Sequence, residues 1–478
     1  MKINNQSWNF ENSYIELPNT LYKKQLPVPV IDPQLVYLNI EQLNELDLNY
    51  FLEDKQKLVD YLSGNKVPEG SIPIAQAYAG HQFGNFTMLG DGRAILLGEQ
   101  INHNNQRYDI QLKGSGQTPF SRNGDGRATL SSMLREYLMS ECVYYLGVPS
   151  TRSLAVIETG EKVFRGDINN GGILTRISSS HIRVGTFEYV SHFCPKEELD
   201  IFIKYVINRH FPEIIESKNL ALQLLKVVMN KQIDLIVNWN RIGFIHGVMN
   251  TDNMSIIGET IDYGPCAFMN IYNPETVFSS IDRNGRYAFG NQSKIAYWNL
   301  SVFAGALLPS ISDNREDAIK LAENILSKFP EIYSKKWYQM MFKKLGIVNP
   351  ITDDIKLVDS LLELMKESQA DYTNTFAALA LDKATKDSLF KLKNFKTWMK
   401  KWVGRVESKK TMQNYNPRFI PRNHLVESAL INAVSGNKKK LDQLLLLFKN
   451  PYDYKNHFDD FQTSPEGFDS TYKTFCGT

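Results

Sequence analysis

Residues 246–264 carry the pattern that most constrains what this chain can fold into. The segment His246-Gly-Val-Met-Asn-Thr-Asp-Asn253 ends in a carboxylate and an amide, and Asp262-Tyr-Gly264 begins nine residues after Asn253. Amide and carboxylate oxygens are the hard ligands that Mg²⁺ or Mn²⁺ takes when it also binds the phosphates of a nucleotide. The pattern therefore predicts a loop that presents Asn253 and Asp262 together as a nucleotide–metal site.

The same spacing occurs in the catalytic loop of protein kinases. There, His-x-Asp-x-x-x-x-Asn supplies a base and a metal-binding Asn, and a later Asp-Phe-Gly supplies the second metal ligand. When Asn253 is aligned with that Asn, the base position falls on Val248, which cannot accept a proton. Asn253 and Asp262 remain as metal ligands, and Asp252 is a different acid beside the Asn. We expect nucleotide and metal binding without the usual route to phosphorylating a hydroxyl.

Length and composition place the chain among ordinary globular proteins. Its 478 residues suffice for two lobes, or for roughly two to three domains, and can bury a large core. The hydrophobic content of 42% and the charged content of 22% are typical of such proteins. A net charge of +2 lacks the basic excess of a dedicated nucleic-acid binder, so no nucleic-acid partner is expected. A local basic cleft for phosphates is compatible with this balance.

Cysteine usage and hydropathy predict a cytoplasmic protein. The segment Met1–Phe10 is polar and shows no signal peptide. The most apolar stretch, Ile295–Leu308, is too short to span a bilayer. We therefore expect a reducing compartment and no membrane partner. Neither a zinc site nor a disulfide framework is expected, because no Cys-x-x-Cys pair occurs among Cys142, Cys194, Cys266 and Cys476.

Predicted strands dominate the sequence up to about residue 180. Before residue 70, prolines punctuate what we expect to be extended surface chain. Segments 86–89 and 93–97 flank Gly90-Asp-Gly92 and predict a β-hairpin. Segment 108–113 alternates apolar and polar residues, as a strand with two unlike faces does.

A helix interrupts these strands. Thr129 predicts its N-cap, and Leu130, Leu134 and Tyr137 belong to its apolar stripe. Further strands are expected at 153–158 and 173–177.

Beyond residue 195 the pattern is mainly helical. The segment Ser255–Ile261 predicts a tight hairpin between Asn253 and Asp262. This order predicts an α+β protein with a bilobal, protein-kinase-like fold. We expect an N-terminal extension and a strand-rich N-lobe in 1–195, and a helical C-lobe with the metal and catalytic loop in 196–478. Apolar periodicity predicts helices at 220–239, 294–308, 316–328, 354–367, 386–402 and 436–448.

Lys113 and Glu136 are candidates for the ion pair that such a fold uses to hold phosphates. Lys113 ends the predicted strand, and Glu136 lies in the predicted helix beside its apolar stripe. A strand lysine that binds phosphate oxygens needs a helix carboxylate to fix it. A lone Lys–Glu pair is more often a surface charge pair. The later Asn253 and Asp262, in the expected order, favour the functional interpretation.

Two glycine turns and two arginines suit a polyphosphate. Gly90-Asp-Gly-Arg93 and Asn123-Gly-Asp-Gly-Arg127 each end in arginine, and glycines let a backbone approach phosphate closely. Neither is a G-x-x-x-x-G-K-[ST] loop, which excludes the P-loop class. Arg176 and Arg183 flank a polar loop and have the charge to bind a phosphate tail. Plain hairpin turns and surface arginines would need no function, and spacing alone leaves both interpretations open.

Other catalytic classes have little support. We expect a structural role for His246, because it lies between an apolar strand and a glycine. No H-x-x-x-H or H-E-x-x-H pattern predicts a zinc hydrolase. No serine lies in a Gly-x-Ser-x-Gly elbow, so a serine hydrolase is not expected.

Long segments of the chain resemble the selenoprotein-O family of pseudokinases, which act as protein adenylyltransferases. The resemblance covers nearly the whole chain. It implies a kinase-like fold that binds ATP in a flipped orientation, with the α-phosphate facing the acceptor. AMP then moves to a protein hydroxyl of Ser, Thr or Tyr, and pyrophosphate leaves. Some members also transfer UMP from UTP with Mn²⁺. The segments that carry the resemblance are Ala75–Gly84, Gly90–Ala94, Leu112–Arg122, Gly124–Ala128, His246–Met254, Ile261–Pro265 and Asn416–Arg422.

The resemblance also implies roles for individual residues. Lys113 would hold phosphates with support from Glu136, and Asn253 and Asp262 would hold Mg²⁺ or Mn²⁺. Asp252 would accept the hydroxyl proton, a role worth roughly 10²–10⁴-fold in rate. The nucleotide contacts that it implies are Gly90, Gly92, Arg93, Lys113, Asp125, Gly126 and Asp262, with Arg176 and Arg183 for the tail phosphate that a flipped nucleotide buries.

One departure from the family concerns redox control. Family members often carry selenocysteine or cysteine near the C-terminus that pairs with a cysteine after the Asp-Tyr-Gly segment. Cys476 matches the first position, but Val277-Phe-Ser-Ser280 offers serines, and Cys266 is the thiol nearest to that segment. A disulfide gate is therefore not predicted for this chain.

Two other hypotheses stay open at this point. An ordinary protein kinase would transfer the γ-phosphate and would need Asp252 to replace the base lost at Val248. A catalytically inactive scaffold would bind ATP and metal and modify nothing. The sequence names neither the protein substrates nor the oligomeric state.

Overall fold

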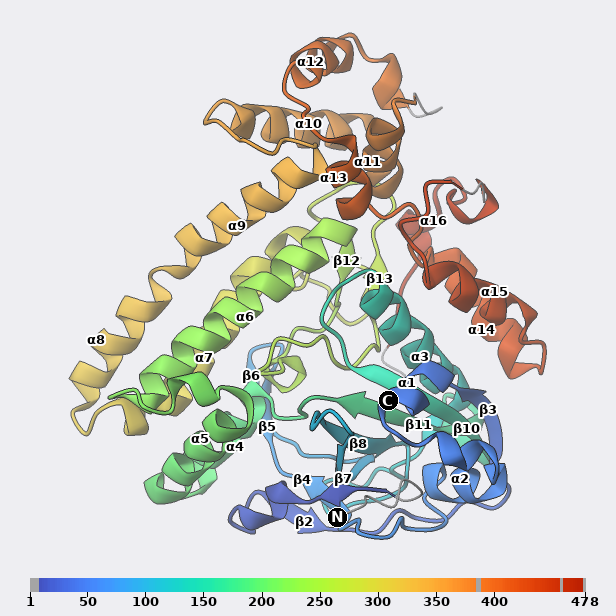
Figure 1. Cartoon of the computed structure of the whole chain (residues 1–478), viewed down its shortest axis with the longest axis vertical. Helices are drawn as coiled ribbons and strands as arrows, with labels where there is room; N and C mark the ends of the chain where they lie inside the picture. Colours follow the sequence, from blue (N-terminus) through green and yellow to red (C-terminus); the bar gives the residue numbers. More distant parts are fainter. Residues whose placement is uncertain (1–7, 384–387, 456–458, 476–478) are drawn as a thin grey trace.

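A nine-stranded antiparallel sheet forms the first part of the molecule (Figure 1). The computed structural model describes residues 8–383, 388–455 and 459–475. Within them the strand order is β2-β4-β7-β8-β11-β10-β3, with β1 beside β7 and β9 beside β11. The strands are β1 (Phe10–Glu11), β2 (Tyr22–Lys24), β3 (Gln34–Leu38), β4 (Ile74–Gln76), β7 (Ala94–Ile101), β8 (Arg107–Lys113), β9 (Ala128–Thr129), β10 (Arg152–Arg165) and β11 (Asp167–Ser178).

Strand β8 lies inside this sheet and ends at the candidate lysine. Its bounds confirm the predicted strand, and β10 and β11 confirm the next two. The register puts Lys113 opposite Ala94 of β7 and Leu174 of β11. Because a neighbouring strand lies on each side, the backbone that carries Lys113 is held firmly.

The prediction of extended surface chain before residue 70 holds only in part. Residues 25–33, with three of the prolines, form no helix or strand and are largely exposed. Helices α1 (Ile40–Glu45) and α2 (Lys55–Leu62) instead bury Leu43 and Leu58 completely, in one apolar cluster with Leu112 of β8. Helices of six to eight residues are too short for a periodic pattern to reveal them.

Helix α3 (Leu130–Tyr145) packs against β10 and β11. Thr129 caps it as predicted, since its Oγ1 accepts a hydrogen bond from the Ser132 N–H at 3.2 Å. Glu136 is buried in this helix and faces the sheet end that carries Lys113. The cap thus fixes where the helix begins and, with it, where Glu136 points.

The chain after β11 is largely helical, which gives the molecule its mixed α+β class (Figure 1). Among the described residues, no helix is both long and apolar enough to cross a membrane. The larger helices are α4 (Val184–Phe193), α5 (Lys196–His210), α6 (Leu220–Ile242), α7 (Gln292–Ile311), α8 (Arg315–Leu326), α9 (Phe329–Lys344), α10 (Asp354–Ser368), α11 (Tyr372–Leu381), α12 (Lys393–Val403), α13 (Lys409–Tyr415), α14 (Asn423–Val434), α15 (Lys439–Phe448) and α16 (Phe468–Thr471).

The predicted helices in this part correspond to α6, α7, α8, α10, α12 and α15, although α12 begins only at Lys393, after a separate 3-10 turn at Ser388–Lys391. Residues 386–387 of one prediction lie outside the described residues. Within the described residues of this part, seven α-helices were not predicted: α4, α5, α9, α11, α13, α14 and α16. Several of them, such as α9, alternate charged and aromatic residues without a clean apolar stripe.

Two predicted hairpins are wrong. Strand β6 (Asn85–Met88) pairs with β5 (Ala79–Gln82) and not with β7, so Gly90 and its neighbours carry the chain between two sheets. Segment 255–261 forms isolated bridges, from Ser255 to Arg183 and from Thr260 to Ser150. The pairing that encloses residues 246–264 (below, the 246–264 segment) is instead β12 (Phe244–Ile245) with β13 (Ala267–Phe268).

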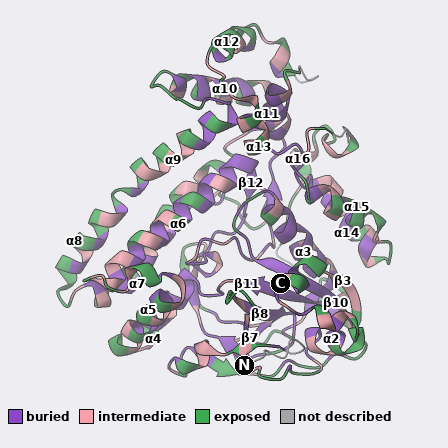
Figure 2. Cartoon of the chain, viewed as in Figure 1, coloured by how far each residue is buried: buried purple, intermediate pink, exposed green. Residues whose placement is uncertain are grey.

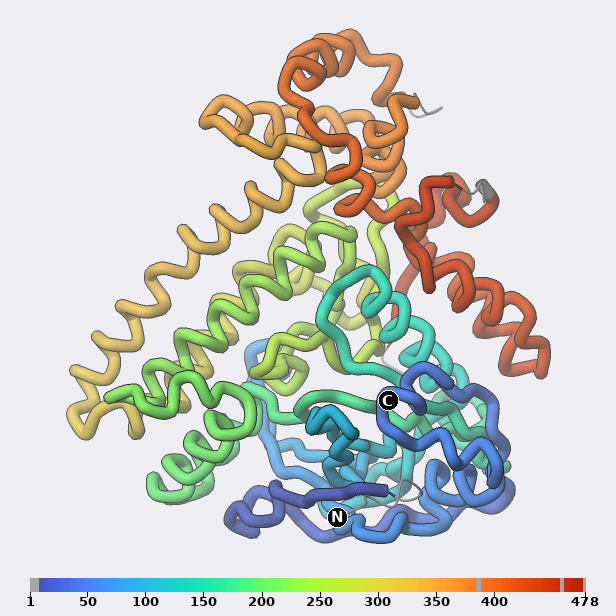
Figure 3. Tube along the Cα trace, in the orientation of Figure 1, coloured from blue at the N-terminus to red at the C-terminus, as the bar shows by residue number. Residues whose placement is uncertain are grey.

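Helices α14 and α15 return from the end of the chain to pack on α3. Figure 3 shows this red C-terminal segment beside the teal segment that contains α3. The sheet strands and the inner faces of the helices are buried, while the outer faces of α12 and α15 are exposed (Figure 2). Helix α3 therefore lies between the sheet and the C-terminal helices.

Candidate active site

A cluster of four charged groups joins β8, α3, β11 and the segment after Asn253; Lys113, Glu136 and Arg176 are buried, and the Asp262 side chain is 30% exposed. Lys113 Nζ donates to Glu136 Oε2 at 2.7 Å and also to Asp262 Oδ1. Arg176 donates from Nε to Glu136 Oε1 at 2.8 Å and from Nη2 to Asp262 Oδ1 at 3.2 Å. Two cations thus face two carboxylates, and the lysine and glutamate singled out in the sequence are in contact.

Both carboxylates of this cluster are held in the ionised form. Burial by itself would raise the pKa of Glu136, but Arg176 and Lys113 hold it below its usual value. Burial acts in the same way on Asp262, and Lys113 and Arg176 hold its pKa well below the usual value. Asp262 also has a φ of +66°, which is uncommon for a non-glycine residue and typical of functional sites.

A cavity of about 290 Å³ opens next to this cluster. Glu136 lies behind Lys113 and does not line it. The cavity brings together every other candidate residue from the sequence: Gly90, Gly92, Arg93, Lys113, Asp125, Gly126, Arg176, Arg183, Asp252, Asn253 and Asp262.

The two glycine turns meet at this cavity. The loop after β8 folds over the first turn, since Thr118 Oγ1 donates to Asp91 O at 2.6 Å and Ser121 Oγ donates to Gly92 O at 2.5 Å. Two turns that lie 34 residues apart, counting from Gly90 to Gly124, therefore form one wall.

Two positions in these turns accept only glycine. Gly90 has a φ of +124°, and a Cβ there would lie 2.4 Å from the ring of Phe120. Gly126 has a φ of +66°, and a Cβ would lie 2.1 Å from the carbonyl carbon of Gly116. Both turns thus bring bare backbone to the cavity, where amide groups can approach a phosphate.

Asp125 lies at the rim of the cavity. Its side chain is 45% exposed and accepts hydrogen bonds from Arg165 Nη2 at 2.6 Å and Nη1 at 2.9 Å. Arg127 of the same turn donates to the backbone oxygens of Val28 and Pro29. The arginine at the end of this turn therefore holds the N-terminal chain, and Arg165 fixes the Asp125 carboxylate at the rim.

Residues 246–253 are arranged as the sequence suggested, with a structural histidine and an asparagine free to bind a metal. His246 is buried, its Nε2 lies 2.9 Å from Ile261 O and its ring stacks on Trp239, as a structural histidine would. Asn253 Nδ2 donates to Val248 O at 3.1 Å, which leaves the amide oxygen to act as a ligand. The Val248 side chain is buried and offers no proton acceptor.

Asp252 lies on a single helical turn, Thr251–Asn253, and is only 8% exposed. Its Oδ2 accepts one long hydrogen bond, from Gln82 Nε2 at 3.4 Å, and its Oδ1 has no partner among the described residues. Burial raises the pKa of this carboxyl to about 6. A carboxylate that is poorly satisfied within the protein is available to accept a proton.

Arg183 connects the cavity with the 246–264 segment. Its Nη1 donates to Asp252 O at 3.0 Å, and its guanidinium lies 4.4 Å from the centre of the Tyr78 ring. Its Nε donates to His181 O at 3.3 Å, and the His181 N–H donates to Asp109 of β8 at 2.9 Å. The sheet thus holds the arginine in place.

The residues present fit a divalent metal ion with a nucleotide. Among the described residues, no three His, Cys, Asp or Glu side chains form a complete metal centre. The Asn253 amide oxygen and the Asp262 carboxylate line one cavity. Mg²⁺ is commonly held in this way, by one or two protein oxygens together with substrate phosphates.

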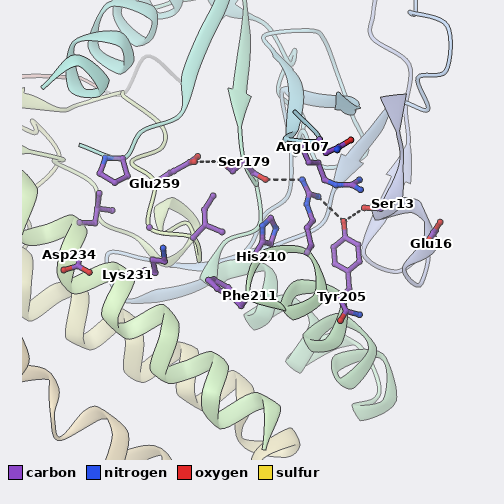
Figure 4. Close-up of a pocket in the computed structure, with 17 residues that line it drawn as sticks. Ser13, Glu16, Arg107, Ser179, Tyr205, His210, Phe211, Lys231, Asp234 and Glu259 are labelled. Carbon is purple, nitrogen blue, oxygen red and sulfur yellow. Dashed lines mark hydrogen bonds between the residues drawn. The ribbon is translucent and has the colours of Figure 1, made fainter. Parts of the chain in front are cut away.

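A larger cavity, of about 970 Å³, is a poorer candidate. Figure 4 shows Ser179, Tyr205, His210 and Glu259 around it, and Arg209 also lines it. Arg209 donates to Asp109 at 2.5 Å, so its charge is already neutralised, and none of the motif residues lines this cavity. Size therefore does not identify the site, whereas the grouping of charges and glycine turns does.

Several cavity residues were missed in the sequence: Tyr78, Gln82, Asp91, Phe120, Arg122 and Arg165. Tyr78 and Gln82 lie in the segment Ala75–Gly84 that carries part of the family resemblance, which was the available signal. Arg165 ends a long strand, and nothing in its local sequence predicts that it reaches the second glycine turn.

Comparisons with known proteins agree with this geometry. A family described as "Protein adenylyltransferase SelO" matches residues 4–449. A "Protein nucleotidyltransferase YdiU" of Clostridium beijerinckii is 51% identical, over 100% of this chain and 99% of its own length. Proteins of the same name are 50% identical in Brevibacillus brevis, over 98% of each chain, and in Clostridium botulinum strain Alaska E43, over 100% of this chain and 99% of the relative. The chain belongs to the SelO family of protein adenylyltransferases.

Proposed function

We propose that this protein nucleotidyltransferase moves AMP from ATP to hydroxyl side chains of Ser, Thr or Tyr in other proteins and releases pyrophosphate. The observation that carries the proposal is the position of the acidic side chain. Val248 stands where a kinase has its base, while the Asp252 carboxylate lines the same cavity as Lys113 and Asp262. The site keeps the phosphate and metal residues and offers a proton acceptor at a different place.

The cationic wall of the cavity is suited to a triphosphate. Lys113, Arg176 and Arg183 are all buried and line the cavity, so their charges act in a medium that screens them weakly. Arg93 and the glycine turns with Gly90, Gly92, Asp125 and Gly126 complete the wall. We assign Arg176 and Arg183 to the tail phosphate, which leaves the α-phosphate toward Asp252.

Asn253 and Asp262 would hold Mg²⁺ or Mn²⁺, which offsets negative charge on the phosphates and orients them. Asp252 would take the proton of the acceptor hydroxyl as that oxygen attacks the α-phosphorus, and the bond to pyrophosphate breaks. Gln82 and Arg183 hold Asp252 by its side chain and its carbonyl oxygen. Chelation of divalent metal with EDTA is expected to abolish transfer.

UMP transfer from UTP, with Mn²⁺, is a second candidate activity. The relatives carry the broader name of protein nucleotidyltransferases, which does not specify the base. The cavity residues described above recognise phosphates and metal, and these groups are the same in ATP and UTP.

We also propose a bilobal, protein-kinase-like arrangement, with a nucleotide-binding N-lobe in residues 1–195 and a helical C-lobe in 196–478. Its support is the position of the cavity, which takes Lys113 and Arg176 from the sheet and Asp252 and Asp262 from the helical part. A nucleotide substrate is in keeping with the cytoplasmic location and the absence of membrane and nucleic-acid partners that the sequence predicts.

Mass spectrometry of an acceptor protein tests this proposal. Casein, chosen as an unfolded protein rich in hydroxyl side chains, is incubated with the enzyme, ATP and Mg²⁺ or Mn²⁺. We expect a mass increase of one AMP per modified hydroxyl. An increase of one phosphate would show a kinase, and unchanged casein with intact ATP binding would favour a scaffold.

A further inference from the structure

The loop after β8 presents a fixed turn at the rim of the cavity. The Phe120 N–H donates to Thr118 Oγ1 at 3.1 Å, and the Thr118 N–H donates to Ser121 Oγ at 2.8 Å. The Ser121 N–H donates to Thr118 O at 3.1 Å, which closes a β-turn with Phe120 at its third position. Because Thr118 and Ser121 are also bonded to the first glycine turn, the backbone that carries Phe120 is held in place.

The Phe120 ring is the aromatic surface that this rim offers. Phe120 is half-buried, and its ring lies against Gly90, where a Cβ would be 2.4 Å from it. Among the described residues, one other aromatic side chain lines the cavity, that of Tyr78. The Arg183 guanidinium lies 4.4 Å from the centre of the Tyr78 ring and occupies it. Tyr78 therefore belongs to the end of the cavity with the buried arginines, and Phe120 to the end with the glycine turns.

Arg122 lines the same rim with an exposed guanidinium. Its side chain forms no hydrogen bond or ion pair with another described residue, whereas Arg165 at this rim is bound to Asp125 and Arg127 to the N-terminal chain. The φ of Arg122 is +47°, followed by +70° at Asn123, which is uncommon for non-glycine residues and typical of functional sites. Of these three rim arginines, Arg122 is thus the one available to a ligand.

We propose that Phe120 and Arg122 form the site for the nucleotide base, which they hold by its flat faces. The inference rests on the proposed function, which assigns the tail phosphate to Arg176 and Arg183 in the buried part of the cavity. With the α-phosphate toward Asp252, the nucleoside extends from there to the open rim. A guanidinium plane and a phenyl ring stack on any base, because every base has a π face.

Recognition by stacking explains how one site would take both ATP and UTP. Adenine and uracil present different hydrogen-bonding edges, so a site built to bind one edge would reject the other base. The rim instead offers an apolar ring and a planar cation, and the Asp125 carboxylate already accepts hydrogen bonds from Arg165 and from the Arg127 N–H. The substrate class is therefore a nucleoside triphosphate with either base.

Calorimetry with analogues that bind but are not transferred tests the base site. ATP and UTP with a methylene group between the α- and β-phosphates cannot release pyrophosphate, and inorganic tripolyphosphate lacks the nucleoside. With Mg²⁺ present, Arg122→Ala should weaken the binding of both analogues about tenfold and that of tripolyphosphate by less than about twofold. Phe120→Leu keeps an apolar side chain against Gly90 but loses the ring, and it should give the same pattern.

Arg122→Lys is the matched control for charge. Lysine keeps the positive charge, and its Cβ keeps the same backbone strain, but it loses the planar face. It should therefore weaken the binding of both analogues nearly as far as alanine does. The melting temperatures of both Arg122 variants should match that of the wild type, because the side chain is exposed.

Full affinity for the analogues in Arg122→Lys, or an equal loss for tripolyphosphate in Arg122→Ala, would show that Arg122 binds phosphate and would overturn the inference. Weaker binding of one analogue alone would show recognition of a base edge, and unchanged binding of both would place the base elsewhere; either result would also overturn it. Failure of the wild-type enzyme to modify casein, with the expected pattern of binding, would count against AMP transfer and not against the base site.

Discussion

At the scale of single residues, Asp252 has surroundings that do not favour stability. It is buried, its Oδ1 lacks a partner among the described residues, and its pKa is raised to about 6 by burial. A poorly satisfied buried carboxylate costs folding free energy. Such a cost is expected where the group is retained for chemistry.

Asp252→Asn should therefore separate activity from stability. We expect transfer to fall about 10²–10⁴-fold, because the amide cannot accept the proton. We expect the melting temperature at neutral pH to rise, because a buried charge is removed. Labelled transfer and thermal unfolding measure the two effects. Asp353→Asn, at an exposed aspartate before α10, is the control and should change neither. Full transfer by the Asp252 variant would remove Asp252 from the proton-transfer role.

Gly80 also determines the position of the Asp252 carboxylate. A Cβ at Gly80 would lie 2.6 Å from Asp252 Oδ1, so the carboxylate packs directly on bare backbone. Gly80→Ala should shift the carboxylate and lower kcat for transfer while leaving the KM for ATP unchanged, as steady-state kinetics would show. Gly305→Ala is the matched control, because a Cβ there meets nothing within 4 Å and alanine favours its helix. An unchanged kcat in Gly80→Ala would show that the position of the carboxylate tolerates displacement.

At the scale of elements, the site depends on the contact of α3 with β8 and β11. Glu136 bridges Lys113 and Arg176, so one helix carboxylate sets the positions of two cations from two strands. The cap at Thr129 holds α3, which carries Glu136. The register of β8 with β11 holds Lys113 and Arg176 independently of that cap.

Glu136→Gln should damage both stability and nucleotide binding. Removing one partner of a buried ionic cluster leaves uncompensated charge, which costs about 3–5 kcal/mol of the free energy of unfolding. Chemical denaturation should show a loss of that size, and calorimetry should show weaker ATP binding because Lys113 is no longer held. Glu323→Gln on the exposed face of α8 is the control. Wild-type ATP affinity in the Glu136 variant would mean that Lys113 needs no support from α3.

The elements that the sequence predicted are those with a strong local signal. Strand β8 alternates cleanly, α3 has a threonine cap, and α6 has a long apolar stripe. The two false hairpins had the local signal of turn residues between strands, but the actual partners differ. Strand β6 pairs with β5, which precedes it in the chain, and segment 255–261 forms bridges to the distant residues Arg183 and Ser150.

At the scale of the whole molecule, the C-terminal helices support the active site from behind α3. Arg135 donates to Glu427 of α14 at 2.7 Å, to Gly264 O at 3.1 Å and to Cys266 O at 2.8 Å. It therefore ties α14 and α3 to the segment just after Asp262. The end of the described chain lies nearby, with the Ser280 N–H donating to Thr474 O at 2.9 Å. Cys476 lies outside the described residues.

Arg135→Ala should weaken catalysis although Arg135 lies outside the cavity. The change removes hydrogen bonds to two backbone oxygens and the cation paired with Glu427, which keeps the hydrogen bond from the Tyr472 hydroxyl, so we expect a loss of about 1–3 kcal/mol in the free energy of unfolding. Metal-dependent ATP binding should weaken, because Asp262 is no longer anchored on that side. Urea denaturation and calorimetry measure both, with Arg315→Ala on exposed α8 as control. Unchanged ATP binding by Arg135→Ala would show that Arg135 contributes only to stability.

The candidate site could be predicted in its parts but not in its assembly. The motif residues Asn253 and Asp262, and the candidates Lys113 and Glu136, were identifiable from spacing and order. The overlay of the two glycine turns, and the approach of Arg165 to the second, depend on tertiary packing between segments far apart in the chain. The resemblance to a family supplied the remaining residues, because it records packing that local patterns do not.

Parallel incubations with ATP labelled at the α-phosphate or at the γ-phosphate test the central claim most directly. Enzyme, casein and divalent metal are held the same in both. The site described here predicts that protein retains label from the α position alone, because AMP is transferred and the γ-phosphate leaves in pyrophosphate. Label retained from the γ position alone would mean that a kinase reaction survives without a base at Val248, and would contradict the account.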